Sequence, residues 1–169
     1  NIRLNEQSLT AINGMTRLLT LDLYNNPLAR IPNLEQMPQL QYVDLANTGI
    51  SQLPPGLLSR AHLTYVMLSD NRISELPIEL FDLPADVTRH FDLSDNPLSD
   101  EALERVKTYF QRTHHYLEAT PAPADTEQAK RLFPTFNGDQ INRFIFGLPG
   151  DLAAGRNEMT RLENEFPNI

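Results

Sequence analysis

The chain has 169 residues, a formal net charge of −8 and no cysteine. Its length suits one domain, its 40% hydrophobic content is enough for a core, and its acidic balance argues against general binding to nucleic acid. The lack of cysteine excludes a disulfide framework, a thiolate metal site and a cysteine nucleophile in these residues, and no apolar run is as long as the roughly 18–20 residues of a membrane-spanning helix.

The first twelve residues, NIRLNEQSLTAI, contain a partial copy of a pattern that recurs later. Ile2, Leu4, Gln7, Leu9 and Ile12 occupy its successive positions. We expect this stretch to close the open N-terminal end of a repeat array with a polar cap. Because the chain begins inside a sequence pattern and without Met, we also expect it to be part of a longer protein.

Four segments then follow the template L-x-x-L-x-L-x-x-N-x-L-x-x-L-P, in which other aliphatic residues replace some leucines. They begin at Leu18, Leu40, Leu63 and Thr88, and the fourth follows the template only as far as Leu98. The L-x-L alternation predicts a short strand with one buried face in each copy. The segments PPGLLSRAH and PIELFDLP predict returns made of loops or short helical turns. The middle leucines are 22, 23 and 25 residues apart: Leu23, Leu45, Leu68 and Leu93.

An asparagine stands at the ninth template position in three copies, as Asn26, Asn71 and Asn96. Its amide can donate to and accept from the backbone of neighbouring coils, so we expect these side chains to form a structural ladder. The second copy has Thr48 at this position. A hydroxyl replaces an amide there, and a weaker rung is expected.

This template is the signature of leucine-rich repeats, and three consecutive full copies make the resemblance specific. It implies an α/β leucine-rich repeat solenoid, in which each coil buries its apolar face against the next and the strands form a short parallel sheet on the concave side. We predict that the array covers residues 1–98, as a partial first repeat plus four others.

Residues 99–118 are predicted to be a capping helix, over Ser99–Tyr116, that lies across the open edge of the last coil. Ser99 is a good N-cap, and Leu103, Val106 and Phe110 form one apolar face. The opposite face is expected in water and carries Glu101, Glu104, Arg105, Lys107 and Arg112.

Residues 119–169 are predicted to be a linker and a helical extension that leads to an absent downstream domain. The stretch ATPAPADT, residues 119–126, has a linker composition. Helices are predicted over Asp125–Phe133, Gly138–Gly147 and Asp151–Phe166. We expect the middle one, which is rich in aromatic residues, to pack between the capping helix and the last helix.

No catalytic motif, cofactor or metal is indicated. The chain has no glycine-rich phosphate loop and no H-E-x-x-H motif. Adjacent residues of a helix point to different faces, so His114 and His115 do not form a chelating pair. His90 and Asp92 share one strand face and could form a metal or acid–base pair. The sequence shows no second imidazole or positioned nucleophile beside them, and Ser94 does not complete a catalytic triad.

The outward template positions three, five, seven and eight predict a binding surface on the concave face. Aromatic residues beside carboxylates form a plausible set of hot spots there, the alternative being a solvated face without a partner. We predict a protein partner with a basic, arginine-rich patch. The partial first copy adds Arg3, Asn5 and Glu6 to this face. The candidate partner-binding residues are Tyr24, Tyr42, Asp44, Tyr65, Met67, Asp70, His90 and Asp92.

The array followed by NPLSDEALERVKTYFQRT and LFPTFNGDQINRFIFGLPGDLAAGRNEMTRLENEF resembles a junction in large bacterial proteins, especially from pseudomonads. In these, leucine-rich repeats precede a novel-E3-ligase (NEL) domain, as in the secreted IpaH-type ubiquitin ligases of enteric pathogens. The resemblance implies a substrate-recognition region whose partner is a host protein or the parent's own catalytic domain. The family's catalytic cysteine has no counterpart in this chain. The alternatives are an adhesin or receptor-type repeat protein that only binds, and an enzyme centred on His90.

Overall fold

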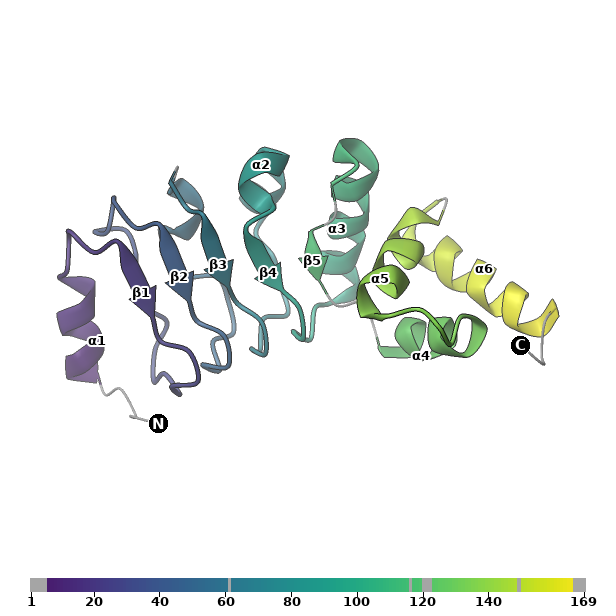
Figure 1. Cartoon of the computed structure of the whole chain (residues 1–169), viewed down its shortest axis with the longest axis horizontal. Coiled ribbons are helices and arrows are strands. Elements are labelled where there is room, and N and C mark those ends of the chain that lie inside the picture. Colours follow the sequence, from purple (N-terminus) through teal and green to yellow (C-terminus); the bar gives the residue numbers. More distant parts are fainter. Residues whose placement is uncertain (1–5, 61, 116, 120–122, 149, 166–169) are drawn as a thin grey trace.

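The structure, a computed structural model, describes residues 6–60, 62–115, 117–119, 123–148 and 150–165. Five short strands form one parallel sheet in chain order, and the coils that carry them stand side by side along the long axis of the molecule (Figure 1). The strands are β1 (Thr20–Asp22), β2 (Tyr42–Asp44), β3 (Tyr65–Met67), β4 (Phe91–Leu93) and β5 (Glu118–Ala119).

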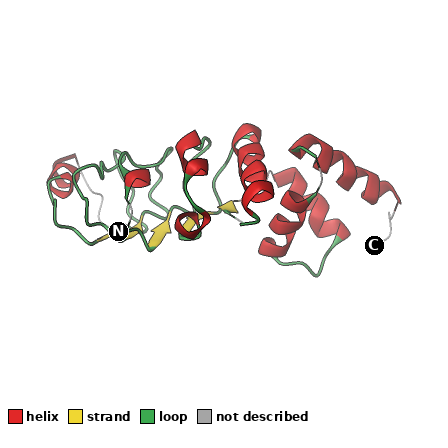
Figure 2. Ribbon diagram, turned by 90° about the horizontal axis from the view of Figure 1, so that it is seen from above, coloured by secondary structure: helices red, strands yellow, loops and turns green. Residues whose placement is uncertain are grey.

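The template leucines form the core of the coils. Leu45, Leu68 and Leu93 are completely buried, and one hydrophobic cluster runs from the first coil into the C-terminal helices. In Figure 2 the strands lie along one side of the array and the returns along the other. Short helices occur in these returns, as predicted: η1 (Leu57–Ser59), η2 (Ile78–Asp82) and α2 (Ala85–Thr88). The predicted α/β leucine-rich repeat solenoid is therefore confirmed.

Asn71 connects the turns of two neighbouring coils through its buried side chain. Its Nδ2 donates to the carbonyl oxygens of Leu45 (2.8 Å) and Leu68 (2.9 Å). Its Oδ1 accepts from the backbone N–H groups of Thr48 (3.1 Å) and Ile50 (3.2 Å). Thr48 occupies the same template position one coil earlier, and its hydroxyl donates to the carbonyl of Leu45 at 2.7 Å. Backbone groups buried between coils thus obtain hydrogen bonds that water does not supply.

Asn96 repeats this arrangement one coil later. Its Nδ2 donates to the carbonyl of Leu68 at 2.9 Å, and its Oδ1 accepts from the N–H of Ile73 at 3.0 Å. Asn26 is only half-buried, and its Nδ2 donates within its own turn to the carbonyl of Tyr24 at 3.0 Å.

The N-terminal stretch does not continue the repeat pattern within the described residues. Glu6–Asn13 is a helix, α1, in which Leu9 is buried. Gln7, Leu9 and Ile12 therefore lie on a helix rather than on a partial coil. The spacing of these residues fits both periods over so short a stretch, and packing against the first coil selects the helix. The predictions for Ile2, Arg3, Leu4 and Asn5 concern residues outside the described ranges.

The predicted capping helix is instead part of a fifth coil. Helix α3 (Asp100–Thr113) begins where Ser99 Oγ accepts from the N–H of Ala102 at 3.1 Å and ends at His114. The chain then forms β5, which pairs in parallel with β4. The sequence pattern predicted a capping helix after Leu98 and did not indicate β5, because Leu117 and Ala119 provide only a short buried pattern and the pairing depends on neighbouring elements.

The tail packs as a helical unit on the far side of α3 (Figure 1). It consists of α4 (Pro123–Leu132), α5 (Gly138–Gly147) and α6 (Leu152–Glu165), and both α5 and α6 contact α3. The helix predicted over Gly138–Gly147 has these same bounds, with Asn137 and Gln140 forming its capping box. The predicted linker is wrong at both ends, since Ala119 belongs to β5 and α4 begins at Pro123.

Polar side chains on α3 hold this helical unit in place. Glu104 Oε2 accepts from the N–H of Leu152, at the start of α6, at 2.6 Å, and Asp100 forms a two-bond ion pair with Arg156. Lys107, predicted on the water-exposed face, is completely buried, and its Nζ donates to the carbonyl of Ile145 at 3.4 Å. The prediction failed because the face of α3 that carries Lys107 is covered by the tail.

Within the described ranges, no helix has both the length and the apolar character that crossing a bilayer requires. The domain limits at residues 98 and 118 stay a prediction. In the structure, one hydrophobic cluster extends across both limits, since it contains Leu93 of the array, Leu103 of α3 and Ile145 of α5.

Candidate functional site

The outward-facing surface of the five strands, which we call the strand face, carries the predicted binding residues. Parallel pairing sets Thr20 beside Tyr42 and Tyr42 beside Tyr65, and the register continues this row to His90. We call these four residues row three. The rings of Tyr42 and Tyr65 stack with their centroids 4.3 Å apart and their planes 6° apart. The sequence predicted the row, and the strand spacing brings the two rings into contact.

The next outward row is acidic, and we call it row five. Its members are paired strand to strand as Asp22, Asp44, Met67, Asp92 and Glu118. Glu118 is exposed and was missed by the sequence analysis, because it lies on the unforeseen strand β5. The only signal available was the alternation of buried Leu117, outward Glu118 and buried Ala119.

The row-five aspartates also shape the turns that follow their strands. In each, one carboxylate oxygen accepts a hydrogen bond from the backbone N–H two residues later. Asp22 accepts from Tyr24 (3.0 Å), and Asp44 accepts from Ala46 (3.0 Å). Asp92 does the same at 2.9 Å. Such side-chain turns are a common structural use of aspartate. Partial burial, followed by the charges of its row neighbours, raises the pKa of Asp44.

Position eight of each coil has a backbone reason for its residue type. Asn25, Asn47, Asp70 and Asp95 all have left-handed φ values, between 53° and 58°. Asn and Asp tolerate this region better than most residues, so Asp70 has a structural role in addition to its outward position. The Nδ2 of Asn47 donates to Oδ1 of Asn25 at 2.8 Å, which connects two coils at the surface.

The remaining predicted residues differ in exposure. The side chain of Tyr24 is 56% exposed, whereas Met67 and His90 are half-buried within their rows. Tyr42 is half-buried against Tyr65; its partial desolvation and the hydrogen bond with Tyr65 raise its pKa to about 12. The phenol of Tyr42 is therefore uncharged at neutral pH, and the strand face combines neutral aromatic rings with carboxylates.

The candidate chemical sites are not assembled by the fold. Among the described residues, no group of three or more His, Asp and Glu side chains is placed to hold a metal ion. Asp92 accepts from both the N–H and the hydroxyl of Ser94, and this uses it as a turn residue. His114 ends α3 with a φ of 53°, and burial together with nearby Arg89 lowers the pKa of His115.

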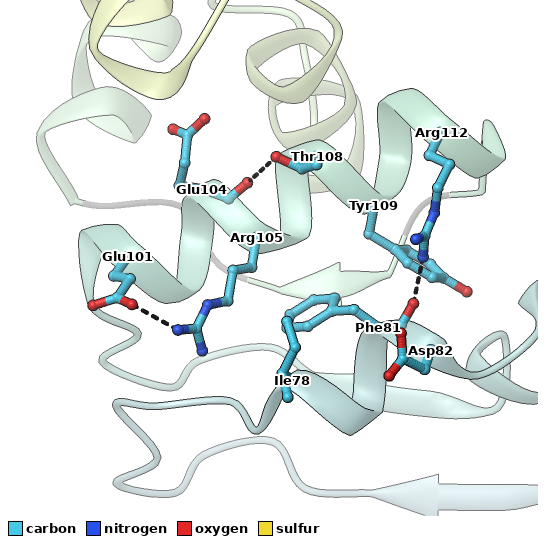
Figure 3. A pocket seen from close by; sticks show the side chains of 9 residues that line it. All are labelled: Ile78, Phe81, Asp82, Glu101, Glu104, Arg105, Thr108, Tyr109 and Arg112. Atoms are coloured by element: carbon cyan, nitrogen blue, oxygen red, sulfur yellow. Dashed lines mark hydrogen bonds and ion pairs between the residues drawn. The ribbon is translucent and has the colours of Figure 1, made fainter.

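A separate hollow of about 320 Å³ lies between η2 and α3 (Figure 3). Its wall includes Ile78, which is 56% exposed, together with Phe81 and Tyr109. The guanidinium of Arg112 lies 5.5 Å from the ring centroid of Tyr109 and donates to the carbonyl of Phe81. The sequence pattern gave no sign of this hollow, because its two sides come from different coils.

Comparison with known proteins identifies the repeat. Residues 16–58 match the family model described as leucine-rich repeats in two copies. Residues 16–58 are therefore leucine-rich repeats. Such regions mediate contacts between proteins through their extended surfaces.

Two individual proteins are similar over parts of their length. A disease resistance protein of Arabidopsis thaliana is 32% identical over 83 residues, which is 48% of this chain and 10% of that protein. The crystal structure of an internalin from Listeria monocytogenes str. 4b F2365 superposes with a TM-score of 0.47 and 23% identity, over 59% of this chain and 28% of the internalin. The chain thus spans only a small part of either protein.

Proposed function

We propose that this chain is a protein-interaction module whose partner docks on the strand face. The observation that carries the proposal is the outward cluster of Tyr24, Tyr42, Tyr65 and Met67, in which one aromatic pair is already stacked. Aromatic residues and Met are enriched at protein interfaces, and a tyrosine gives large contact area at low entropic cost. A face that only meets water would not need three outward tyrosines.

The charge of this face supports a partner with a basic patch. Rows three and five contain no Lys or Arg, and the acidic members of row five stand on four of the five strands. Opposite charge steers encounter and disfavours wrong partners. The same carboxylates repel phosphate, so nucleic acid and an anionic membrane surface are disfavoured as partners.

For the longer protein, we propose the substrate-recognition region of a secreted bacterial E3 ubiquitin ligase-like effector. The support is the likeness of residues 96–113 and 132–166 to the junction that precedes NEL domains. The attachment of α5 and α6 to α3 fits such a role, because it gives a following domain a fixed base. The strand face would then receive either a host substrate or the parent's own catalytic domain. The alternative is an adhesin or receptor-type repeat protein that only binds.

The first test locates the binding surface by photo-crosslinking. A crosslinking amino acid at Tyr24 should capture a defined partner, and the same amino acid at Ile78, beside η2, should not. The identified partner should then bind the Tyr42→Ala, Tyr65→Ala double variant on the order of tenfold more weakly, or worse, since aromatic anchors dominate interfaces. Ile78→Ala is the matched control and should bind normally. Equal binding by both variants refutes the proposed surface.

The second test concerns the longer protein. A ligase parent should have a cysteine-containing helical domain after this region and should form a thioester with ubiquitin when supplied with charged E2 enzyme. A parent without ubiquitin loading but with partner binding through the strand face supports the binding-only alternative.

A further inference from the structure

Row three places an aromatic ring on only one side of Tyr42 among the described residues. Tyr65 covers the face turned toward β3, with the ring centroids 4.3 Å apart. On the other side, toward β1, the neighbour in register is Thr20, which is exposed. A threonine side chain ends one atom beyond Cβ, whereas a tyrosine ring stands well above the sheet. The stack of rings therefore stops at Tyr42, with a space over Thr20 where a third planar layer would fit.

Two carboxylates border this space. Asp22 follows Thr20 by two residues and Asp44 follows Tyr42 by two residues, so both point to the same side of the sheet as the ring. They are direct partners in the register of β1 and β2. Each uses one oxygen to accept a backbone N–H in its own turn. A carboxylate has about four lone-pair sites, so both side chains keep acceptor capacity toward the open space.

We propose that this space, bounded by Thr20, Tyr42, Asp22 and Asp44, is a binding site for the guanidinium group of an arginine on a protein partner. A guanidinium is planar, is less strongly hydrated than an ammonium and stacks on aromatic faces. Its five N–H donors in a fork match two carboxylates beside the ring. A lysine provides a compact charge without a plane, and an apolar side chain would leave the carboxylates desolvated and unpaired.

The wider surface favours this occupant. The chain carries a net charge of −8, and rows three and five contain no Lys or Arg among the described residues. Tyr24, two residues beyond Asp22, is 56% exposed and offers apolar contact for the aliphatic stem of an arginine. The inference rests on the proposed protein-binding function and names the chemistry that the face selects.

The test uses the whole chain labelled with ¹⁵N and three capped tripeptides, acetyl-Gly-X-Gly-amide, with X as arginine, lysine or citrulline. Citrulline keeps the shape of arginine but has no charge. The arginine peptide should shift the amide signals of Thr20, Asp22 and Asp44 in a saturable way. Lysine should bind several-fold more weakly and citrulline should cause no saturable shift. Similar curves for arginine and lysine, or shifts spread over all acidic residues, overturn the proposal.

Variants separate the site from the general charge of the face. Thr20→Tyr extends the ring stack into the space and should weaken binding of the arginine peptide on the order of tenfold or more. Thr64→Tyr makes the same change at another exposed threonine and should bind as the parent chain does. Asp22→Asn should weaken binding while it keeps the turn, because an amide oxygen also accepts the N–H of Tyr24.

The outcomes distinguish this inference from the broader function. Loss of arginine selectivity, together with intact capture of the partner through Tyr42 and Tyr65, removes the guanidinium site and leaves the proposed docking surface. Arginine-selective binding that Thr20→Tyr abolishes and Thr64→Tyr preserves supports the site even where no partner is captured. Equal peptide binding by these two variants refutes it.

Discussion

Asn71 offers the sharpest test of how the coils are held together. Substitution by alanine removes a buried amide that connects the turns of two coils. The carbonyls that it serves keep other donors, since Leu45 also accepts from the Thr48 hydroxyl and Leu68 from Asn96. The loss therefore falls on the N–H groups that its Oδ1 accepts, chiefly those of Thr48 and Ile50, which are buried at these bonds.

The expected magnitude follows from these two groups. A buried donor without a partner costs about 1–3 kcal/mol. Two such donors, with some relief from entering water, predict a loss of about 3 kcal/mol in the free energy of unfolding for Asn71→Ala. The matched variant Asn26→Ala changes the same residue type in a half-exposed turn. There water replaces the lost bonds, and the expected loss is about 1 kcal/mol.

The measurement is equilibrium unfolding in urea, followed by circular dichroism. The unfolding free energies of the two variants are compared with the same dependence on urea concentration. Stability in repeat proteins is a sum over contacts between neighbouring coils. Asn71→Ala should therefore also reduce the cooperativity of unfolding more than Asn26→Ala does. If Asn26→Ala costs as much as Asn71→Ala, the reasoning from buried N–H groups is wrong.

Two further predictions concern the tail and the strand face. Lys107→Ala removes a buried side chain between α3 and the tail, so it should lower the free energy of unfolding by about 2–4 kcal/mol and make α4–α6 sensitive to limited proteolysis. The control, Lys130→Ala, changes an exposed lysine and should alter stability by less than about 0.5 kcal/mol. Equal protease resistance of both variants contradicts this. Tyr42 has a pKa raised to about 12, so the folded state holds its phenol proton more tightly than the unfolded chain does. The stability that this supplies is complete below about pH 10, the ordinary tyrosine pKa, and is lost as pH rises toward 12. In alkaline unfolding experiments, the stability of Tyr42→Phe should therefore fall less steeply with pH than that of the parent chain.

The strand positions and their outward rows could be predicted because each coil repeats its own local code. Leucines at every second position define a buried face, and an asparagine nine positions into the template satisfies the turn, so Tyr42 and Tyr65 could be assigned to neighbouring outward positions. The identity of the candidate surface thus depends on spacing alone. Its separate structural duties, such as the turn bond of Asp44 and the left-handed backbone of Asp70, were not visible, since one residue type serves both purposes.

The ends of the array were predicted less well, because there the repeat no longer specifies the neighbours. The stretch Glu6–Asn13 satisfies a strand template and a helical period equally, and only packing decides between them. At the other end, the pairing of Glu118 with Asp92 depends on α3 returning the chain to the sheet edge. Two residues of strand carry too little local preference to be read from their own sequence.

The amino-acid sequence by itself determined that this protein is a stack of leucine-rich coils with a tyrosine- and aspartate-bearing outward face, because a periodic pattern encodes contacts between identical neighbours. Only the tertiary structure decided that the array has a fifth strand, that Lys107 is buried beneath the helical tail, and that the ring of Tyr42 stacks on that of Tyr65. These features arise between elements distant in sequence or different in size, where contact depends on which side chain stands on the adjacent strand or helix.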